Sequence, residues 1–356
     1  MDSYQLLAKR LDALPNGFPA TDDGAEIRLL EKLFSPEEAK LAVMLKITLE
    51  TPKSIASRLG RDFQEVRQML KGMVKRGLIK AGKTEGGLGY GLLPFVVGIY
   101  EFQIGRIDAE LAQLFEDYYQ KAFTGVLEVS PKLHRVVPVY EAIQTGLEIA
   151  PYESVGQIVA NAKAWGVLDC ICRVQKALIG DPCEHPVDVC MTMSDRPGAY
   201  DGHPEIQALT QEEAMETLKR AADAGLVHSV SNSQEGLWYV CNCCTCSCGI
   251  LRGMAEMGVA NVVAKSSYIN VVDSDLCSGC EDCVDFCQFN ALKLGDDFVM
   301  TVSELRCVGC GVCVPKCSTG ALSLVLREER EVPPVTEEDW LEARAESRGQ
   351  NLDELR

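Results

Sequence analysis

Two runs of four cysteines near the C-terminal end constrain the fold of this chain more than any other feature. The first run is Cys277-x-x-Cys280-x-x-Cys283-x-x-x-Cys287, and the second is Cys307-x-x-Cys310-x-x-Cys313-x-x-x-Cys317. Each cysteine of the second run lies 30 residues after its counterpart in the first, so the segment is an internal repeat. Three thiolates at this spacing can wrap one loop around three irons of a cube, while the fourth thiolate must come from elsewhere.

This repeat resembles the bacterial ferredoxins that carry two 4Fe-4S clusters. In that family the fourth cysteine of each run binds the other cluster. The resemblance therefore implies one cluster on Cys277, Cys280, Cys283 and Cys317, and a second on Cys307, Cys310, Cys313 and Cys287. Gln288 and Ser318 stand where proline often follows the fourth cysteine, a departure that concerns turn rigidity and not ligation. Zinc ribbons are the alternative, but they take four ligands in two pairs.

A second group of nine cysteines lies upstream. They are Cys170, Cys172, Cys183, Cys190, Cys241, Cys243, Cys244, Cys246 and Cys248. Thiolates at this density repel one another unless a cation neutralises them, so we expect them to bind metal. Eight of them would serve two further 4Fe-4S clusters; structural zinc on sets of four and a redox-active pair at Cys243 and Cys244 are the alternatives. No role is assigned to His185, His203 or His228, because a lone histidine is more often a satisfied core or surface residue.

The cysteine usage and the charge of the chain indicate its compartment and partners. Seventeen cysteines is an odd number, and their tight C-x-C and C-x-x-C groups suit metal in a reducing compartment better than disulfides. No apolar run approaches the roughly 18 residues that span a bilayer, so we expect a cytoplasmic protein without a membrane span. The net charge of −17 favours docking onto a basic redox partner and opposes general affinity for nucleic acid.

The N-terminal part, residues 1–93, resembles a winged helix-turn-helix domain. Ser35 with Glu38 is a helix-capping signal, and Asp62 with Glu65 is another. A short helix is expected between them, and the glycine-rich segment 86–91 predicts a two-stranded wing after the third helix.

Four further segments complete an α+β multidomain organisation. They are an α+β connecting region at 94–168, a cysteine-rich region at 169–265, the two-cluster ferredoxin-like domain at 266–327 and an acidic tail at 328–356. The apolar pattern predicts a strand over residues 95–100 and helices over residues 107–123, 152–165 and 211–224. A weaker helical signal at 336–347 predicts a tail helix that is solvated or docked.

The combination resembles the multi-cluster 4Fe-4S proteins of strict anaerobes, which are mostly known as electron-transfer components. It rests on Cys170-Ile171-Cys172-Arg173, Pro182-Cys183, the cysteine-rich block 241–248 and the two-cluster repeat. The resemblance implies a protein that relays single electrons through two ferredoxin clusters, and one or two more, to a partner oxidoreductase. Nucleotide-binding glycine motifs are absent, so no flavin or nicotinamide site is evident. An enzyme label stays open, with a non-catalytic subunit of an oxidoreductase complex favoured.

An iron-sulfur transcription regulator is the rival hypothesis. Between Lys53 and Lys83, nine Lys or Arg residues stand against Asp62 and Glu65, a balance of +7. Those on or next to the expected recognition helix are Arg61, Arg67, Lys71, Lys75 and Arg76, which suits insertion into a major groove. The same residues also suit the solvated face of an amphipathic helix. In the electron-transfer hypothesis the winged helix instead serves docking or homodimerisation, since a fold does not dictate one function.

Overall fold

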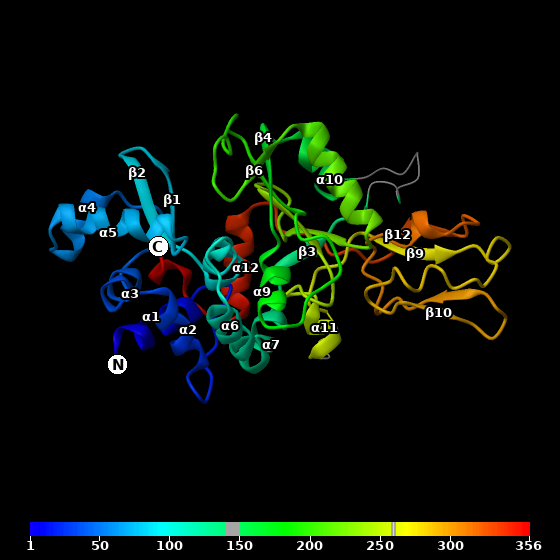
Figure 1. Cartoon of the computed structure of the whole chain (residues 1–356), viewed down its shortest axis with the longest axis horizontal. Helices are drawn as coiled ribbons and strands as arrows, with labels where there is room; N and C mark the ends of the chain where they lie inside the picture. The colour runs from blue at the N-terminus through cyan, green and yellow to red at the C-terminus, as the bar shows by residue number, and fades with distance from the viewer. Residues whose placement is uncertain (140–141, 143–149, 258, 260) are drawn as a thin grey trace. The chain divides into compact units, whose positions relative to one another are not determined.

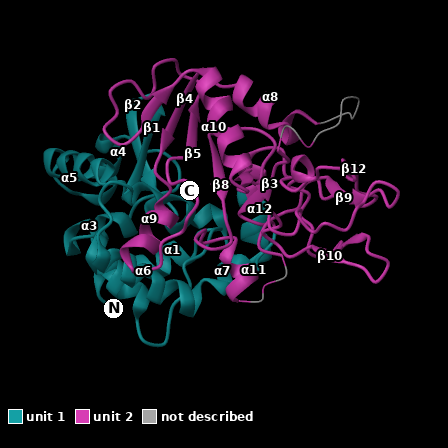
Figure 2. Cartoon of the chain, turned by 45° about the vertical axis from the view of Figure 1, so that its right-hand side comes forward, with its two compact units in different colours: residues 1–130, 341–356 teal, residues 131–340 magenta. Residues whose placement is uncertain are grey.

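The computed structural model describes residues 1–139, 142, 150–257, 259 and 261–356, which form two compact units (Figure 1). The first unit comprises residues 1–130 and 341–356, and the second comprises residues 131–340 (Figure 2). Within the described residues, no helix has both the length and the apolar character needed to cross a membrane.

The first unit is helical apart from one β-hairpin. Its helices are α1 (Ser3–Asp12), α2 (Ala25–Leu33), α3 (Pro36–Val43), α4 (Pro52–Leu59), α5 (Phe63–Lys75), α6 (Ala109–Ala122) and α7 (Thr124–Leu127), with a kinked turn at Phe95–Ile99 and a short helical turn at Glu101–Gln103. Strands β1 (Ile79–Thr84) and β2 (Gly87–Leu92) pair antiparallel. Helices α3, α4 and α5 and the hairpin therefore follow one another in the predicted order.

Both predicted helix caps are confirmed. The Ser35 hydroxyl accepts a hydrogen bond of 3.3 Å from the Glu38 amide, and the Glu38 carboxylate accepts one of 2.9 Å from the Ser35 amide. At the start of α5, the Asp62 carboxylate accepts a bond of 2.9 Å from the Glu65 amide. These bonds satisfy amides that the first turn of a helix leaves without intrahelical partners.

The strand predicted over residues 95–100 is wrong, because this segment forms a kinked turn in which only Val96 and Val97 have extended backbone angles. Its apolar residues pack into an aromatic cluster: the Phe95 ring lies 4.6 Å from that of Phe18, and the Tyr100 ring stacks at 3.7 Å on Phe115. A short apolar run fits a buried turn as well as a strand, and here tertiary packing decided.

The C-terminal residues are docked, not solvated. Helix α12 (Glu337–Ser347) is followed by a helical turn at Leu352–Glu354. Arg344 is fully buried, and its guanidinium donates hydrogen bonds to the carbonyl oxygens of Pro15, Val126 and Val129. The tail therefore completes the core of the first unit.

The second unit contains a six-stranded antiparallel sheet in the order β3-β7-β8-β5-β4-β6. The strands are β3 (His134–Val136), β4 (Ala164–Leu168), β5 (Cys190–Ser194), β6 (Gln207–Leu209), β7 (Val227–Ser231) and β8 (Tyr239–Cys243). Its helical elements are a turn at Pro151–Glu153, α8 (Val155–Ala160), α9 (Ile171–Leu178), α10 (Gln211–Asp223) and α11 (Arg252–Glu256).

Helices α8 and α10 supply the apolar residues that cover the sheet. Ile158 and Leu218 belong to one buried cluster with Met191, Met193 and Val240 from the strands. The helices predicted at 107–123 and 211–224 are confirmed as α6 and α10. The helix predicted over 152–165 is shorter, because the chain leaves α8 at Ala160 and enters β4.

The ferredoxin-like part of the second unit contains two small antiparallel strand pairs. Strand β9 (Tyr268–Val272) pairs antiparallel with β12 (Leu322–Leu326), and β10 (Leu292–Leu294) pairs with β11 (Met300–Val302); a helical turn spans Val314–Lys316. The two loops that carry the cysteine runs connect these strands, so the strands hold both loops around one small apolar core.

Candidate metal centres

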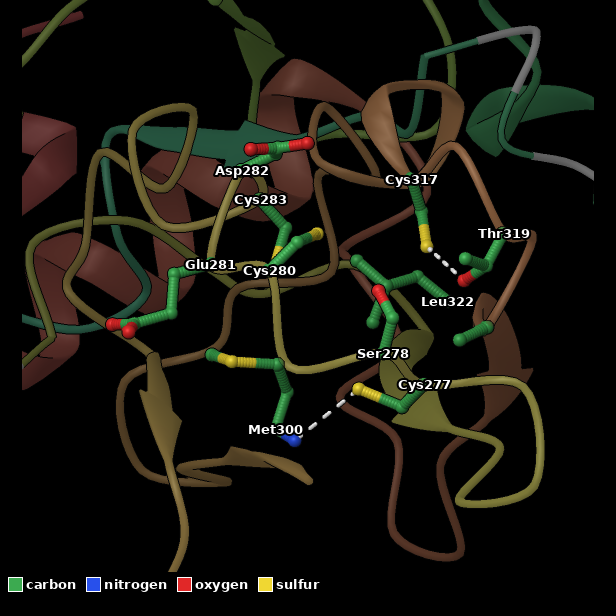
Figure 3. A pocket seen from close by; sticks show the side chains of 11 residues that line it. Cys277, Ser278, Cys280, Glu281, Asp282, Cys283, Met300, Cys317, Thr319 and Leu322 are labelled. Carbon is green, nitrogen blue, oxygen red and sulfur yellow. Dashed lines mark hydrogen bonds between the residues drawn. The ribbon is translucent and has the colours of Figure 1, made fainter. Parts of the chain in front are cut away.

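The first three cysteines of the first run lie around one pocket with the last cysteine of the second run (Figure 3). Cys277, Cys280, Cys283 and Cys317 line it together with Met300, Ala321 and Leu322. The amide of Met300 donates to the Cys277 sulfur at 3.4 Å, and Cys317 contacts the Thr319 hydroxyl at 3.5 Å. The carboxylates of Glu281 and Asp282 point away from the sulfur atoms. Four thiols are the donor set that a 4Fe-4S cluster requires, and the apolar side chains around them would shield it from water.

The other four cysteines of the runs form a second, more buried group. Burial raises the pKa of Cys310 to about 12, and the neighbouring thiols of Cys287 and Cys307 raise it further. Burial and the same neighbours also raise the pKa of Cys313. Polar donors reach this group as well: the amide of Ala291 donates to the Cys287 sulfur at 3.2 Å. Cys287 from the first run thus lies with three cysteines of the second.

The turns of the two loops depend on glycine at equivalent positions. Gly279 has φ of 66° and Gly309 has φ of 71°, a region that L-residues with a side chain rarely adopt. A Cβ atom at Gly309 would also overlap the carbonyl of Tyr268, and one at Gly279 would overlap that of Phe298. Each cysteine loop therefore has a glycine at the point where a neighbouring backbone carbonyl leaves no room for a side chain.

Six of the nine upstream thiols form a closed ring in which the pKa of each is shifted chiefly by two others. Around the ring the order is Cys170, Cys172, Cys248, Cys243, Cys241 and Cys190. The neighbouring Cys172 thiol lowers the pKa of Cys170 well below its ordinary value, whereas Cys170 raises the pKa of Cys172. All seventeen cysteines are free thiols. Thiols packed so closely cannot all ionise unless a cation is bound among them.

Strand register explains why four of these six meet. Strands β4 and β5 pair with Leu168 opposite Cys190, and Cys170 follows two residues after β4 ends. The register between β5 and β8 brings Cys190 beside Cys241. Because alternate residues of a strand share a face, Cys241 and Cys243 lie on the same side of β8. The sheet therefore gathers cysteines at the end where β4 and β8 finish and β5 begins.

The remaining three upstream cysteines lie in a separate group with a histidine. The Sγ atoms of Cys183, Cys244 and Cys246 and a ring nitrogen of His185 all lie within 4.8 Å of one another. Cys183 is 3.0 Å from Cys246 and 3.7 Å from Cys244. His185 has no predicted role in the sequence, but the Cys183-x-His185 spacing is a pattern that indicates a metal ligand at this position.

Arg173 lies between the two upstream groups. Its side chain is fully buried and donates to the carbonyl of Asn242 at 2.9 Å and to the sulfur of Cys244 at 3.5 Å. Burial by itself would lower the pKa of Arg173, but the surrounding thiols, first Cys170 and then Cys244, raise it above its ordinary value. The guanidinium therefore supplies a fixed positive charge to both thiol groups.

Gln288 connects the upstream cysteines to the ferredoxin-like region. Its side-chain oxygen accepts hydrogen bonds from the amide and the hydroxyl of Thr245, at 2.9 and 3.0 Å. Its side-chain nitrogen donates to the carbonyl of Gly225 at 2.8 Å. Thr245 separates Cys244 from Cys246, and Gln288 directly follows Cys287. Proline at position 288 would remove this connection.

Comparison with known proteins identifies one part of the chain. Residues 276–321 match the family model of the 4Fe-4S dicluster domain. No curated protein and no solved structure matches the chain. The chain thus contains a ferredoxin-type region of the class that binds 4Fe-4S clusters and takes part in iron-sulfur electron transfer.

Proposed function

We propose that this protein relays single electrons through two 4Fe-4S clusters in its dicluster domain and a third in the six-thiol ring, and passes them to a partner oxidoreductase. The observation that carries the proposal is the arrangement of the two cysteine runs. Cys283 and Cys313, one from each run, share a single apolar cluster with Leu292, Met300 and Leu322. Two clusters built on these loops would be close neighbours, as electron exchange between them needs.

The ligands we propose are those implied by the ferredoxin resemblance. One set is Cys277, Cys280, Cys283 and Cys317, and the other is Cys307, Cys310, Cys313 and Cys287. The pocket that contains the first set supports this division, as do the effects of neighbouring thiols on the pKa of Cys310 and Cys313. When bound, a 4Fe-4S cluster takes up or releases one electron while spreading the charge over several irons.

The chain contributes hydrogen-bond donors and apolar surroundings to these sites. The amides of Met300 and Ala291 and the side chain of Asn270 direct N–H groups at cysteine sulfurs. Such donors favour the more negative, reduced state. Apolar side chains around Cys283 and Cys313 exclude water from the region between the two loops.

The six-thiol ring supports a third cluster. A ring of six thiols offers more than the four ligands that a cubane needs. Connections through the protein run from the ring past Arg173 to Cys244, and from Thr245 through Gln288 to Cys287. These contacts connect the ring to the dicluster domain through the protein.

An acidic surface beside the first pocket is the proposed docking site for the redox partner. Between residues 273 and 297, seven acidic residues stand against one lysine, a balance of −6. They are the exposed Asp273, Asp275, Glu281, Asp282, Asp285, Asp296 and Asp297. Cys280 is also exposed here. A basic partner would be attracted electrostatically to the more exposed of the two ferredoxin-type sites.

Iron and acid-labile sulfide in the full chain, isolated without oxygen, test this proposal. We expect about twelve irons per chain, eight in the dicluster domain and four in the ring, all reducible by a low-potential one-electron donor. A triple variant with Cys172→Ser, Cys190→Ser and Cys241→Ser, which leaves only three ring thiols, is expected to lower the content to about eight. A wild-type content of about eight irons, unchanged in this variant, would refute the third cluster. Fewer than about eight would refute the dicluster assignment.

Regulation of transcription is a second candidate, favoured by one exposed basic face. Arg67, Lys71 and Lys75 are exposed along α5 at intervals of four residues. Three other arginines of this region are instead ion-paired within the unit, in the pairs Arg58–Glu50, Arg61–Glu65 and Arg76–Glu38. Retention on duplex DNA that weakens steeply with salt, and that is lost in Lys71→Glu, would favour the regulator. No retention would favour docking or dimerisation by a winged-helix domain.

A further inference from the structure

We propose that Cys183, His185, Cys244 and Cys246 hold a single zinc ion in a tetrahedral site with three thiolates and one imidazole. The site is distinct from the six-thiol ring and does not depend on the redox function proposed above. It divides the nine upstream cysteines into six and three, in place of the two sets of four that two further clusters would need.

The four donor atoms lie within 4.8 Å of one another, which is close enough for one ion and closer than the ligands of a cluster stand. Two thiolates on one zinc ion, each about 2.3 Å from it, are about 3.8 Å apart in a tetrahedron. The Cys183 sulfur lies 3.7 Å from that of Cys244 and 3.0 Å from that of Cys246, and Nδ1 of His185 lies 3.7 Å from Cys246. Thiolates of a cubane stand further apart, because each binds a different iron.

The ligands come as two pairs from two loops. Cys183 and His185 belong to the loop between α9 and β5, and Cys244 and Cys246 directly follow β8. Two C-x-C or C-x-H pairs on separate loops are typical of structural zinc sites, in which the metal joins segments distant in sequence. A set of thiolates with one imidazole suits Zn²⁺ better than Mg²⁺ or Ca²⁺, which prefer oxygen ligands.

Hydrogen bonds and charge around the site also suit a divalent cation. The Cys183 sulfur accepts a bond of 3.4 Å from the His185 amide, and the Cys244 sulfur accepts one of 3.5 Å from Arg173. Three thiolates with Zn²⁺ carry a net charge of −1, which Arg173 offsets.

The position of the site gives the ion a structural task. Cys243 and Cys248, which flank the loop that carries Cys244 and Cys246, belong to the six-thiol ring. Thr245, between the two zinc ligands, is hydrogen-bonded to Gln288 beside Cys287. A redox-inert ion here would hold the ring and the dicluster domain at a fixed separation without itself taking an electron.

Metal analysis of the full chain, isolated without oxygen, tests the site. We expect one zinc per chain in the wild type and at least a tenfold lower zinc content in His185→Ala after dialysis against a mild chelator. Iron content is expected to stay unchanged, which also reports that the variant has folded. His203→Ala is the matched control, because His203 is exposed and lies outside the thiol groups, and it is expected to retain zinc.

His185→Cys gives the test a second readout. This variant is expected to keep the ion, and after exchange of zinc for Co²⁺ its sulfur-to-cobalt absorption should rise from that of three thiolates toward that of four. The assignment would be overturned if the wild type contained no zinc or if His185→Ala kept its full zinc content. It would also be overturned if His185→Ala lost one or four irons in place of zinc. A wild type that contains zinc but not the eight irons of the dicluster domain would refute the relay and leave the zinc site supported.

Discussion

The side-chain amide of Asn270 donates a hydrogen bond of 3.2 Å to the sulfur of Cys313. Asn270 is buried on β9, so this donor is shielded from water and held in one place. A donor to a ligating sulfur stabilises the reduced cluster more than the oxidised one, because the reduced cluster is more negative.

We therefore expect Asn270→Leu to lower the reduction potential of the cluster on Cys313. If about 1 kcal/mol of differential hydrogen-bond energy is lost, the shift is roughly 40 mV for a one-electron couple. A redox titration followed by electron paramagnetic resonance measures it. Asn232→Leu is the control, since Asn232 is also buried but donates to the carbonyl of Lys132 and not to a sulfur. An unchanged potential in Asn270→Leu with intact clusters would contradict this role.

Gln288→Leu should loosen the loop that contains Thr245. The substitution removes the acceptor of two hydrogen bonds, each worth about 1 kcal/mol, so amide hydrogen exchange in the loop should accelerate about tenfold or more. Hydrogen-exchange mass spectrometry measures this directly. Ser318→Leu is the matched control, because Ser318 occupies the equivalent position of the second run and is exposed. Equal exchange in the two variants would show that the Gln288 connection does not hold the loop.

Charge reversal on the acidic surface should slow encounter with a basic partner. The double variant Glu281→Lys and Asp282→Lys is expected to reduce the second-order rate of electron transfer to a basic c-type cytochrome about tenfold at low ionic strength. Stopped-flow absorbance measures the rate, and added salt should narrow the difference. Glu328→Lys with Glu329→Lys applies the same charge change outside this surface and should have a smaller effect. Equal slowing by both double variants would show that only net charge matters.

His134 should make the second unit less stable in mild acid. Burial lowers the pKa of His134 to about 4, against about 6.5 in an unfolded chain. The unfolded state therefore takes up a proton first as the pH falls, so stability is full above about pH 6.5 and declines toward pH 4. Between pH 7 and pH 5 the loss is about 2 kcal/mol. Urea unfolding at the two pH values measures it, and the His134→Gln variant, which cannot titrate, should show a correspondingly smaller loss.

The sequence alone determined the local features of this protein. The two cysteine runs, their offset and the helix caps at Ser35 and Asp62 are readable because the residues that cooperate lie within a few positions of one another. The helical periods of α6 and α10 are readable for the same reason. The match of residues 276–321 to the 4Fe-4S dicluster domain agrees with the sequence interpretation of that region.

Only the tertiary structure decided how the nine upstream cysteines divide. Cys170, Cys190 and Cys241 come from three separate strand ends, and the register of β4, β5 and β8 brings them together. His185 joins three of the thiols because two loops about sixty residues apart meet beside the sheet. Spacing along the chain carries no information about such partners, since the pairing of distant strands, and not local geometry, sets which donor atoms are within reach of one ion.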